Sequence, residues 1–144
     1  MSRIGACLCG AVSYVITTDP THTGACHCNM CRKWSGGVFM GLQTPADGLQ
    51  ITGADAITTF KSSDWAERAF CNKCGSSLYY RVTAPGPHQG TYHVGIGTLD
   101  NPNGIALTEE IFIDEKPDGY SFSQHTKTMT GAEVFAMFAP PDGR

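Results

Sequence analysis

Seven cysteines are the residues in this 144-residue sequence whose type and spacing point most directly to chemistry. They fall into three short motifs: Cys7-Leu8-Cys9, Cys26-His27-Cys28-Asn29-Met30-Cys31 and Cys71-Asn72-Lys73-Cys74. Thiolates are preferred zinc ligands, and clustered cysteines in a chain without a readable secretory signal favour metal binding over disulfides. The spacing therefore predicts zinc as the cofactor, with two ions per chain.

The first predicted site is closed. Cys71 and Cys74 have the two-residue gap of a zinc knuckle, a tight turn that directs both sulfurs to one ion. Such a turn supplies two of four tetrahedral ligands, and Cys7 with Cys9 is the pair that remains once the middle motif is set aside. We expect these four cysteines to hold a structural zinc that ties the N-terminal segment to a distant turn.

The second predicted site is open. Cys26, Cys28 and Cys31 place three sulfurs within six residues. Three protein ligands leave the fourth tetrahedral position of zinc to water or substrate, which is the arrangement of catalytic zinc. His27 lies between two of these ligands, and in an extended segment its side chain points away from the metal. A place in the surrounding pocket is therefore favoured for His27 over ligation.

Other uses of cysteine fit the pattern less well but stay open at this point. Buried apolar cysteines, disulfides and one zinc site with spare thiols are all compatible with seven residues. Iron–sulfur clusters commonly use four ligands each, and the middle motif has three. A redox dithiol at Cys71 and Cys74 would be expected in a βαβ context, which the surrounding sequence lacks.

Charged and aromatic residues follow the middle motif directly. Arg32 and Lys33 could meet the carboxylates of a substrate, although they could also be solvated surface cations. Trp34 and Phe39 flank two glycines and could form a pocket wall, although aromatic residues in strands usually belong to the core. We predict Arg32, Lys33 and Trp34 as substrate-binding residues.

Short β-branched and aromatic runs separated by turns predict a mainly β fold. The expected strands are Ala11 to Thr17, Gly37 to Leu42, Asp55 to Lys61, Ser77 to Val82, Thr91 to Ile96 and Glu110 to Ile113. Near the end, Thr130 and Glu133 have capping-box spacing, which predicts a short C-terminal helix that stops at Pro140-Pro141. The sequence reads as one domain over residues 1–144.

Composition excludes several functional classes. Charged residues make up 16% of the chain and the formal net charge is −3, which does not indicate a nucleic-acid partner. No apolar run approaches the roughly 20 residues needed to cross a bilayer, and the N-terminus lacks the apolar stretch of a secretory signal. We expect a cytoplasmic protein without a membrane partner. The sequence does not indicate an oligomeric state.

The order of motifs resembles a known family. Cys7-x-Cys9-Gly10, Cys26-His27-Cys28-x-x-Cys31-Arg32-Lys33, Cys71-x-x-Cys74-Gly75 and the later Ile111-Phe112 with Lys116-Pro117 resemble the glutathione-dependent formaldehyde-activating enzymes over residues 5 to about 120. The resemblance implies an Mss4-like fold of several sheets around zinc. It also implies a structural zinc on Cys7, Cys9, Cys71 and Cys74, and a catalytic zinc on Cys26, Cys28 and Cys31.

The resemblance also implies an activity. The founding members join formaldehyde to glutathione as S-hydroxymethylglutathione and are classed as carbon–sulfur lyases, whereas a centromere protein V type belongs to the same family. We therefore predict a zinc-dependent carbon–sulfur lyase whose partners are glutathione or a similar thiol and formaldehyde or a related aldehyde. The alternatives are a lyase for a different thiol adduct and a non-catalytic zinc-binding or redox-sensing module. One departure is Asp118-Gly119-Tyr120, where family members often carry tryptophan.

Overall fold

The computed structural model describes residues 2–138 and divides them into two compact units. The first unit comprises residues 2–23 and 40–106, and the second comprises residues 24–39 and 107–138. Eleven strands and two α-helices are formed within the described residues, so the expected β fold with a short C-terminal helix is confirmed. None of the described helices is long and apolar enough to cross a membrane.

A three-stranded antiparallel sheet lies in the first unit. It consists of β1 (Arg3–Ala6), β2 (Ser13–Ile16) and β5 (Leu49–Thr52), with β2 in the centre. Side chains alternate along β2, so Tyr14 and Ile16 are buried while their neighbours are less so. The turn between β1 and β2 carries the first two cysteines.

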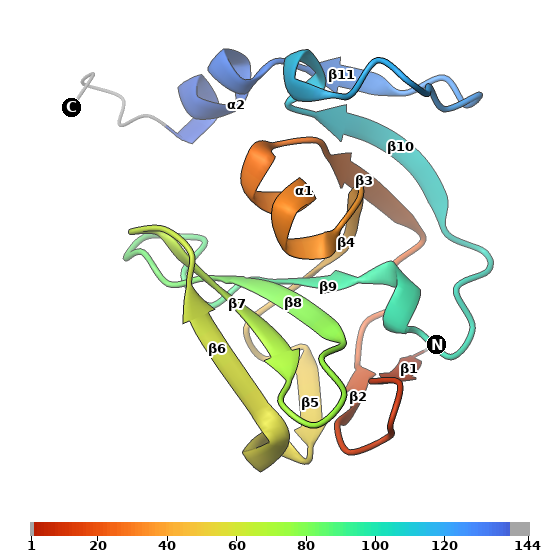
Figure 1. Ribbon diagram of the computed structural model, residues 1–144, viewed down its shortest axis with the longest axis vertical. Coiled ribbons are helices and arrows are strands. Elements are labelled where there is room, and N and C mark those ends of the chain that lie inside the picture. The colour runs from red at the N-terminus through yellow and green to blue at the C-terminus, as the bar shows by residue number, and fades with distance from the viewer. Residues whose placement is uncertain (1, 139–144) are drawn as a thin grey trace. The chain divides into compact units, whose positions relative to one another are not determined.

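The larger antiparallel array of the first unit carries the second pair. Its strands, in spatial order, are β4 (Phe39–Thr44), β9 (Tyr92–Gly95), β8 (Ser77–Val82), β7 (Ala66–Cys71) and β6 (Ile57–Lys61). Figure 1 shows β6, β7 and β8 side by side in yellow to green. Two 3-10 helices, Ala54–Ala56 and Ile96–Thr98, flank these strands. β7 ends on Cys71, which is fully buried.

Two hydrophobic clusters form the core of the first unit. One contains Cys7, Val12, Ala56, Cys71 and Leu78, and the other contains Tyr14, Ile16, Leu42, Val94 and Leu99. Cysteines from both the first and the third motif therefore belong to one apolar cluster. A metal at this position would be part of the core of the unit.

The second unit holds the middle motif. Its elements are the end of β3 (His22–Cys26), α1 (Asn29–Ser35), β10 (Ala106–Ile111), the 3-10 helix Ile113–Glu115, β11 (Lys127–Met129) and α2 (Gly131–Phe138). β10 hydrogen-bonds to β3 on one side and to β11, which runs parallel to it, on the other. This arrangement brings the motif beside residues more than 80 positions later in the sequence. The backbone amide of His27, for example, donates to the carbonyl of Ile111 at 3.1 Å.

The C-terminal helix begins as the sequence predicts. The amide of Glu133 donates to Thr130 Oγ1 at 3.2 Å, and the amide of Thr130 donates to Glu133 Oε1 at 3.1 Å. These two bonds are the reciprocal capping box, and they satisfy amides that the first turn leaves without helical partners. The predicted stop at Pro140-Pro141 lies outside the described residues.

Candidate active site

The four cysteines of the first and third motifs come together in the first unit. All four sulfur atoms lie within 4.8 Å of one another. The Sγ atoms of Cys7 and Cys9 are 3.6 Å apart, and those of Cys9 and Cys71 are 3.8 Å apart. A Zn–S bond of about 2.3 Å corresponds to a tetrahedral edge of about 3.8 Å. The sulfur positions therefore fit a tetrahedral zinc.

Two glycine turns create this geometry. Gly10 and Gly75 follow the two cysteine pairs, and both have φ of 80°, a left-handed conformation that glycine adopts without steric penalty. The amide of Gly10 donates to the carbonyl of Cys7 at 3.1 Å, and that of Gly75 donates to the carbonyl of Cys71 at 2.7 Å. The same turn type on both segments directs each pair of sulfurs toward the other pair.

Amide and hydroxyl groups prepare these sulfurs to be thiolates. The amide of Val12 lies 3.3 Å from Cys7 Sγ as a donor, and the Ser76 hydroxyl and amide lower the pKa of Cys74 to about 5. For Cys9 the Ala11 amide lowers the pKa, but burial and the neighbouring sulfurs outweigh it and raise the pKa to about 11. Four sulfurs this close can all be ionised only with a cation among them. The donor set thus matches a divalent metal.

The three cysteines of the middle motif form a second cluster in the other unit. Cys26 is the last residue of β3, Cys28 is the N-cap of α1, and Cys31 lies in the first turn of that helix. Their sulfur atoms lie within 4.8 Å of one another, and the nitrogens of His27 are not part of this group. The segment is extended as far as Cys28, where ψ is 154°, and then turns into helix. The helical turn brings Cys31 back to the first two sulfurs.

This cluster also matches a cation. The sulfurs of Cys28 and Cys31, together with burial, raise the pKa of Cys26 well above its ordinary value. Cys28 Sγ accepts the amide of Cys31 at 3.3 Å, a bond that caps the helix and stabilises a thiolate. Three sulfurs supply one ligand fewer than a tetrahedral metal requires. The residues present therefore fit a metal with one open position.

A cavity of about 570 Å³ is formed by residues of the second unit. Its lining consists of His27, Arg32, Lys33, Gly36, Gly37, Val38, Pro117 and Tyr120. Arg32 and Lys33, which were predicted from their position after Cys31, both contribute to this lining, whereas Trp34 is half-buried and is not part of it. α1 ends at Ser35, and its C-cap Gly36, with a left-handed φ of 74°, leads into Gly37 and Val38, which also line the cavity.

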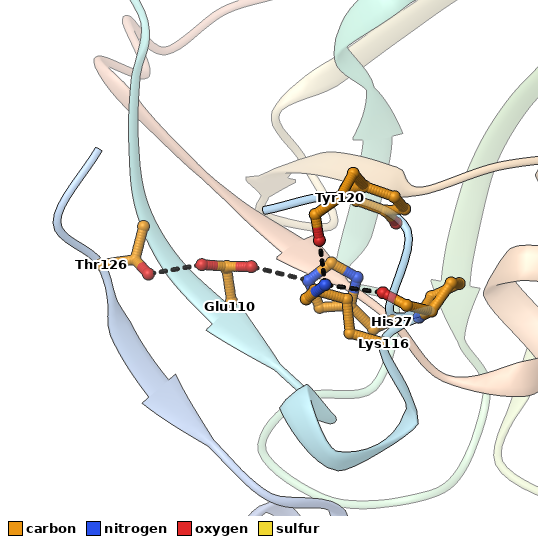
Figure 2. A network of polar contacts seen from close by, with 6 residues as sticks. His27, Glu110, Lys116, Tyr120 and Thr126 are labelled. Carbon is orange, nitrogen blue, oxygen red and sulfur yellow. Dashed lines mark hydrogen bonds and ion pairs between the residues drawn. The ribbon is translucent and has the colours of Figure 1, made fainter. Parts of the chain in front are cut away.

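The His27 side chain contacts the buried carboxylate of Glu110, as Figure 2 shows. His27 Nε2 lies 2.8 Å from Glu110 Oε1, and the other carboxylate oxygen accepts the Thr126 hydroxyl at 2.6 Å. Burial acts to raise the pKa of Glu110, but the hydrogen bonds from Thr126 and His27 outweigh it and lower the pKa. Glu110 is therefore suited to accept hydrogen bonds from both neighbours, with His27 Nε2 facing one carboxylate oxygen and the Thr126 hydroxyl facing the other.

Pro117 and Tyr120 of the cavity lining belong to a loop that is held by Lys116 (Figure 2). Lys116 Nζ donates to the carbonyl oxygen of Pro117 at 2.6 Å and to that of Tyr120, and it lies 4.7 Å from the centre of the Tyr120 ring. The rings of Tyr120 and Phe122 pack 6.4 Å and 6.1 Å from the His27 ring, centre to centre. These contacts fix Tyr120 in the cavity wall.

The turn that leads into this loop is strained. Phe112 has φ of 55° and ψ of 43°, the left-handed region that bulky side chains rarely adopt. Its ring packs edge-on against Phe135 of α2, with centres 5.6 Å apart, and Asp114 accepts the amide of Gly131 at 2.8 Å. The start of α2 thus holds Phe112 in place, and the chain turns sharply between β10 and Lys116.

Comparisons with known proteins identify the family. A model of the glutathione-dependent formaldehyde-activating enzymes matches residues 2–115. The chain belongs to this family. A protein of Schizosaccharomyces pombe named an uncharacterized lyase is 30% identical over 133 residues, which cover 90% of this chain and 92% of that protein.

Two further comparisons extend this result. A Halomonas elongata protein named for the same family is 34% identical over 83 residues, and the match covers 52% of this chain and 53% of that protein. A crystal structure of a Rhodobacter sphaeroides protein is 21% identical, has a TM-score of 0.54, and covers 73% of this chain and 99% of that one. This last likeness concerns the fold alone.

Sequence reasoning missed Glu110 as a residue of this site and did not assign a role to Tyr120. Glu110 contacts His27 across 83 positions of the chain, and only its place beside Glu109 in a β-strand, where neighbouring side chains point to opposite faces, could have indicated that one of the two carboxylates is buried. Tyr120 was noted as a departure from the usual tryptophan, and the structure places it in the cavity wall. Both depend on the loop and strand that approach the motif from the far end of the sequence.

Proposed function

We propose that this protein is a zinc-dependent carbon–sulfur lyase that joins formaldehyde, or a related small aldehyde, to the thiol of glutathione and also catalyses the reverse reaction. The observation that carries the proposal is the cluster of Cys26, Cys28 and Cys31, one ligand short of a tetrahedral set, in the segment that contributes His27 and Arg32 to the cavity wall. The four-cysteine site would hold a second, structural zinc.

The chemistry requires little beyond an ionised thiol and a positioned aldehyde. Bound zinc supplies a positive charge at its open coordination position, which lowers the pKa of a thiol there. In the synthetic direction the thiol sulfur forms a bond to the aldehyde carbon, and the proton lost by the thiol ends on the new hydroxyl oxygen. In the lyase direction the same bond breaks and the carbonyl re-forms.

The cavity suits a small anionic thiol. Arg32 and Lys33 place two cationic groups in its wall, and glutathione carries two carboxylates at neutral pH. The cavity volume of about 570 Å³ is within the range of small-molecule sites. Tyr120 supplies an aromatic surface that can cover the peptide part of the ligand. These features support a glutathione-like substrate.

Exchange NMR tests the proposal directly. Zinc-loaded protein is expected to accelerate exchange between hydrated formaldehyde and S-hydroxymethylglutathione above the uncatalysed rate. Cys28→Ser should abolish the acceleration while glutathione and formaldehyde concentrations stay the same. If the protein carries two zinc ions per chain and exchange is still not accelerated, the formaldehyde activity is rejected. Acceleration with another thiol, such as free cysteine, would then favour a lyase for a different adduct.

A further inference from the structure

A buried nitrogen in the cavity wall has no hydrogen-bond partner. The His27 side chain is fully buried, and its Nδ1 atom is unpaired among the described residues, although the ring contributes to the cavity. Buried polar atoms in native proteins nearly always have a partner, so an exception at a cavity points to a group that arrives with a ligand.

The other side of the ring determines what Nδ1 can do. Nε2 donates its hydrogen to Glu110 Oε1 at 2.8 Å, and Thr126 holds the second oxygen of that carboxylate at 2.6 Å. An imidazole that donates through Nε2 in its neutral form offers Nδ1 as an acceptor. The ring cannot rotate freely, because Phe122 stacks on it with an interplanar angle of 27°. The network therefore fixes the orientation of His27 and leaves Nδ1 as the ring atom that can bind a ligand group.

The substrate offers a matching donor only after the carbon–sulfur bond has formed. Glutathione held through its sulfur has no hydroxyl group near the metal, whereas its hydroxymethyl adduct has one on the carbon next to the sulfur. His27 is the residue between two of the three cysteines and also lines the cavity assigned to the thiol substrate, so the hydroxyl of the adduct and the His27 ring would share that cavity. An acceptor here would distinguish the adduct from the free thiol.

We propose that His27 Nδ1 accepts a hydrogen bond from the hydroxyl of the bound hydroxymethyl thiol adduct, and that Glu110, held by Thr126, is the positioning residue that directs Nδ1 to this task. The inference rests on the proposed function and deepens it, because it assigns the polar contact that recognises the adduct. His27 is then a substrate-contacting residue, and Glu110 acts through it.

Imidazole NMR on zinc-loaded protein with ¹⁵N-labelled histidine is the first test. The signals of His27 are identified by their loss in His27→Gln. We expect Nε2 to be protonated and Nδ1 to be an acceptor in the wild-type protein. Addition of glutathione together with formaldehyde should shift Nδ1, whereas glutathione alone or formaldehyde alone should not. A hydrogen on Nδ1 in the free protein, or a shift that is the same with glutathione alone, would overturn the inference.

Variants of Glu110 provide the second test. Glu110→Leu removes the acceptor for Nε2, and a loss of about tenfold or more in the exchange rate is expected. Glu110→Gln can keep both hydrogen bonds, because its amide oxygen accepts from His27 and its amide NH₂ donates to the Thr126 oxygen. It should therefore retain most of the wild-type exchange rate. Glu109→Gln is the matched control on the same strand, and its exposed side chain should leave the rate unchanged.

The two tests separate the inference from the function on which it rests. A positioning role predicts that Glu110→Leu lowers kcat while its zinc content and its affinity for glutathione stay unchanged. Equal rate losses in the Gln and Leu variants, or a loss of zinc from the Leu variant that accounts for its rate, would refute positioning. Because Glu110→Leu can fail to fold, Thr126→Val serves as a second variant with the carboxylate intact, and it should lower the rate by a smaller factor. If exchange is accelerated but none of the three additions shifts Nδ1, the inference falls and the proposed function stands; if zinc-loaded protein does not accelerate exchange, both fall.

Discussion

The two cysteine clusters should differ in how much they stabilise the fold, and replacement of one cysteine in each cluster tests this difference. Cys74→Ser removes a ligand of the four-cysteine site, which joins segments 62 residues apart at Cys9 and Cys71. Cys28→Ser removes a ligand of the three-cysteine site, whose outer members are separated by five positions. The serine at position 28 can still cap α1, because its hydroxyl can accept the Cys31 amide that the sulfur accepts now.

The expected difference follows from loop closure. Bringing the ends of a 62-residue loop together instead of those of a five-residue loop costs about 2 kcal/mol more in chain entropy, from (3/2)RT ln(62/5). An unfolded chain can therefore assemble the three-cysteine site almost locally and bind metal there, which reduces the contribution of that site to folding. The four-cysteine site forms only in the folded unit, where Cys7 and Cys71 are part of the core.

Urea unfolding followed by far-UV circular dichroism measures the difference, with zinc content determined by a colorimetric chelator. We expect each variant to lose one zinc ion. Cys74→Ser should lose at least about 2 kcal/mol more of its free energy of unfolding than Cys28→Ser, on the loop-closure argument. Equal destabilisation of the two variants, or a greater loss in Cys28→Ser, would refute the division into structural and catalytic sites.

Three further predictions follow from particular contacts. Burial, together with the charge of His88, lowers the pKa of His93 to about 4 from 6.5, so stability should fall as the pH falls from 6.5 towards 4, by about 3 kcal/mol in total. In His93→Phe the free energy of unfolding, measured by urea titration at several pH values, should depend less on pH than in the wild-type protein. The same pH dependence in both proteins would argue against this role of His93. Thr130→Ala breaks one half of the capping box and should lower the free energy of unfolding by about 1 kcal/mol, and an unchanged urea midpoint would contradict the role of the cap. Lys33→Gln should raise the KM for glutathione by about two- to fivefold at unchanged kcat, an effect that added salt suppresses, whereas a fall in kcat alone would place Lys33 outside the binding contacts.

The sequence was informative where chemistry is local. The spacing of the cysteines predicted the clusters of four and three, because a thiolate pair in a tight turn can serve one ion and the number of ligands decides which site is closed. The capping box at Thr130 and Glu133 was equally readable, since both of its hydrogen bonds lie within four residues. Five of the eleven strands in the described residues largely overlap the predicted β-branched runs, with ends shifted by a few residues. The sixth run, Glu110 to Ile113, was misplaced, because β10 already ends at Ile111 and the chain turns at Phe112 into a 3-10 helix.

Other elements carry no strong local signal. α1 was not predicted, because its N-cap is a cysteine and its seven residues are too few for a clear helical period. β7 was missed because Arg68 is buried in the middle of the strand, where an alternating pattern would place an apolar residue. In both cases burial and tertiary pairing override weak intrinsic propensities.

The sequence by itself determined the family of this protein and the grouping of its cysteines into clusters that could hold metal ions, because residue type and spacing are properties of short segments. Only the tertiary structure decided what surrounds the open cluster. Glu110 reaches His27 across 83 positions, and Lys116 folds Tyr120 into the cavity wall. These contacts depend on β10 lying between β3 and β11, a pairing that brings together residues with no relation in sequence. Partners of this kind are specified by the packing of the whole unit, which no local pattern records.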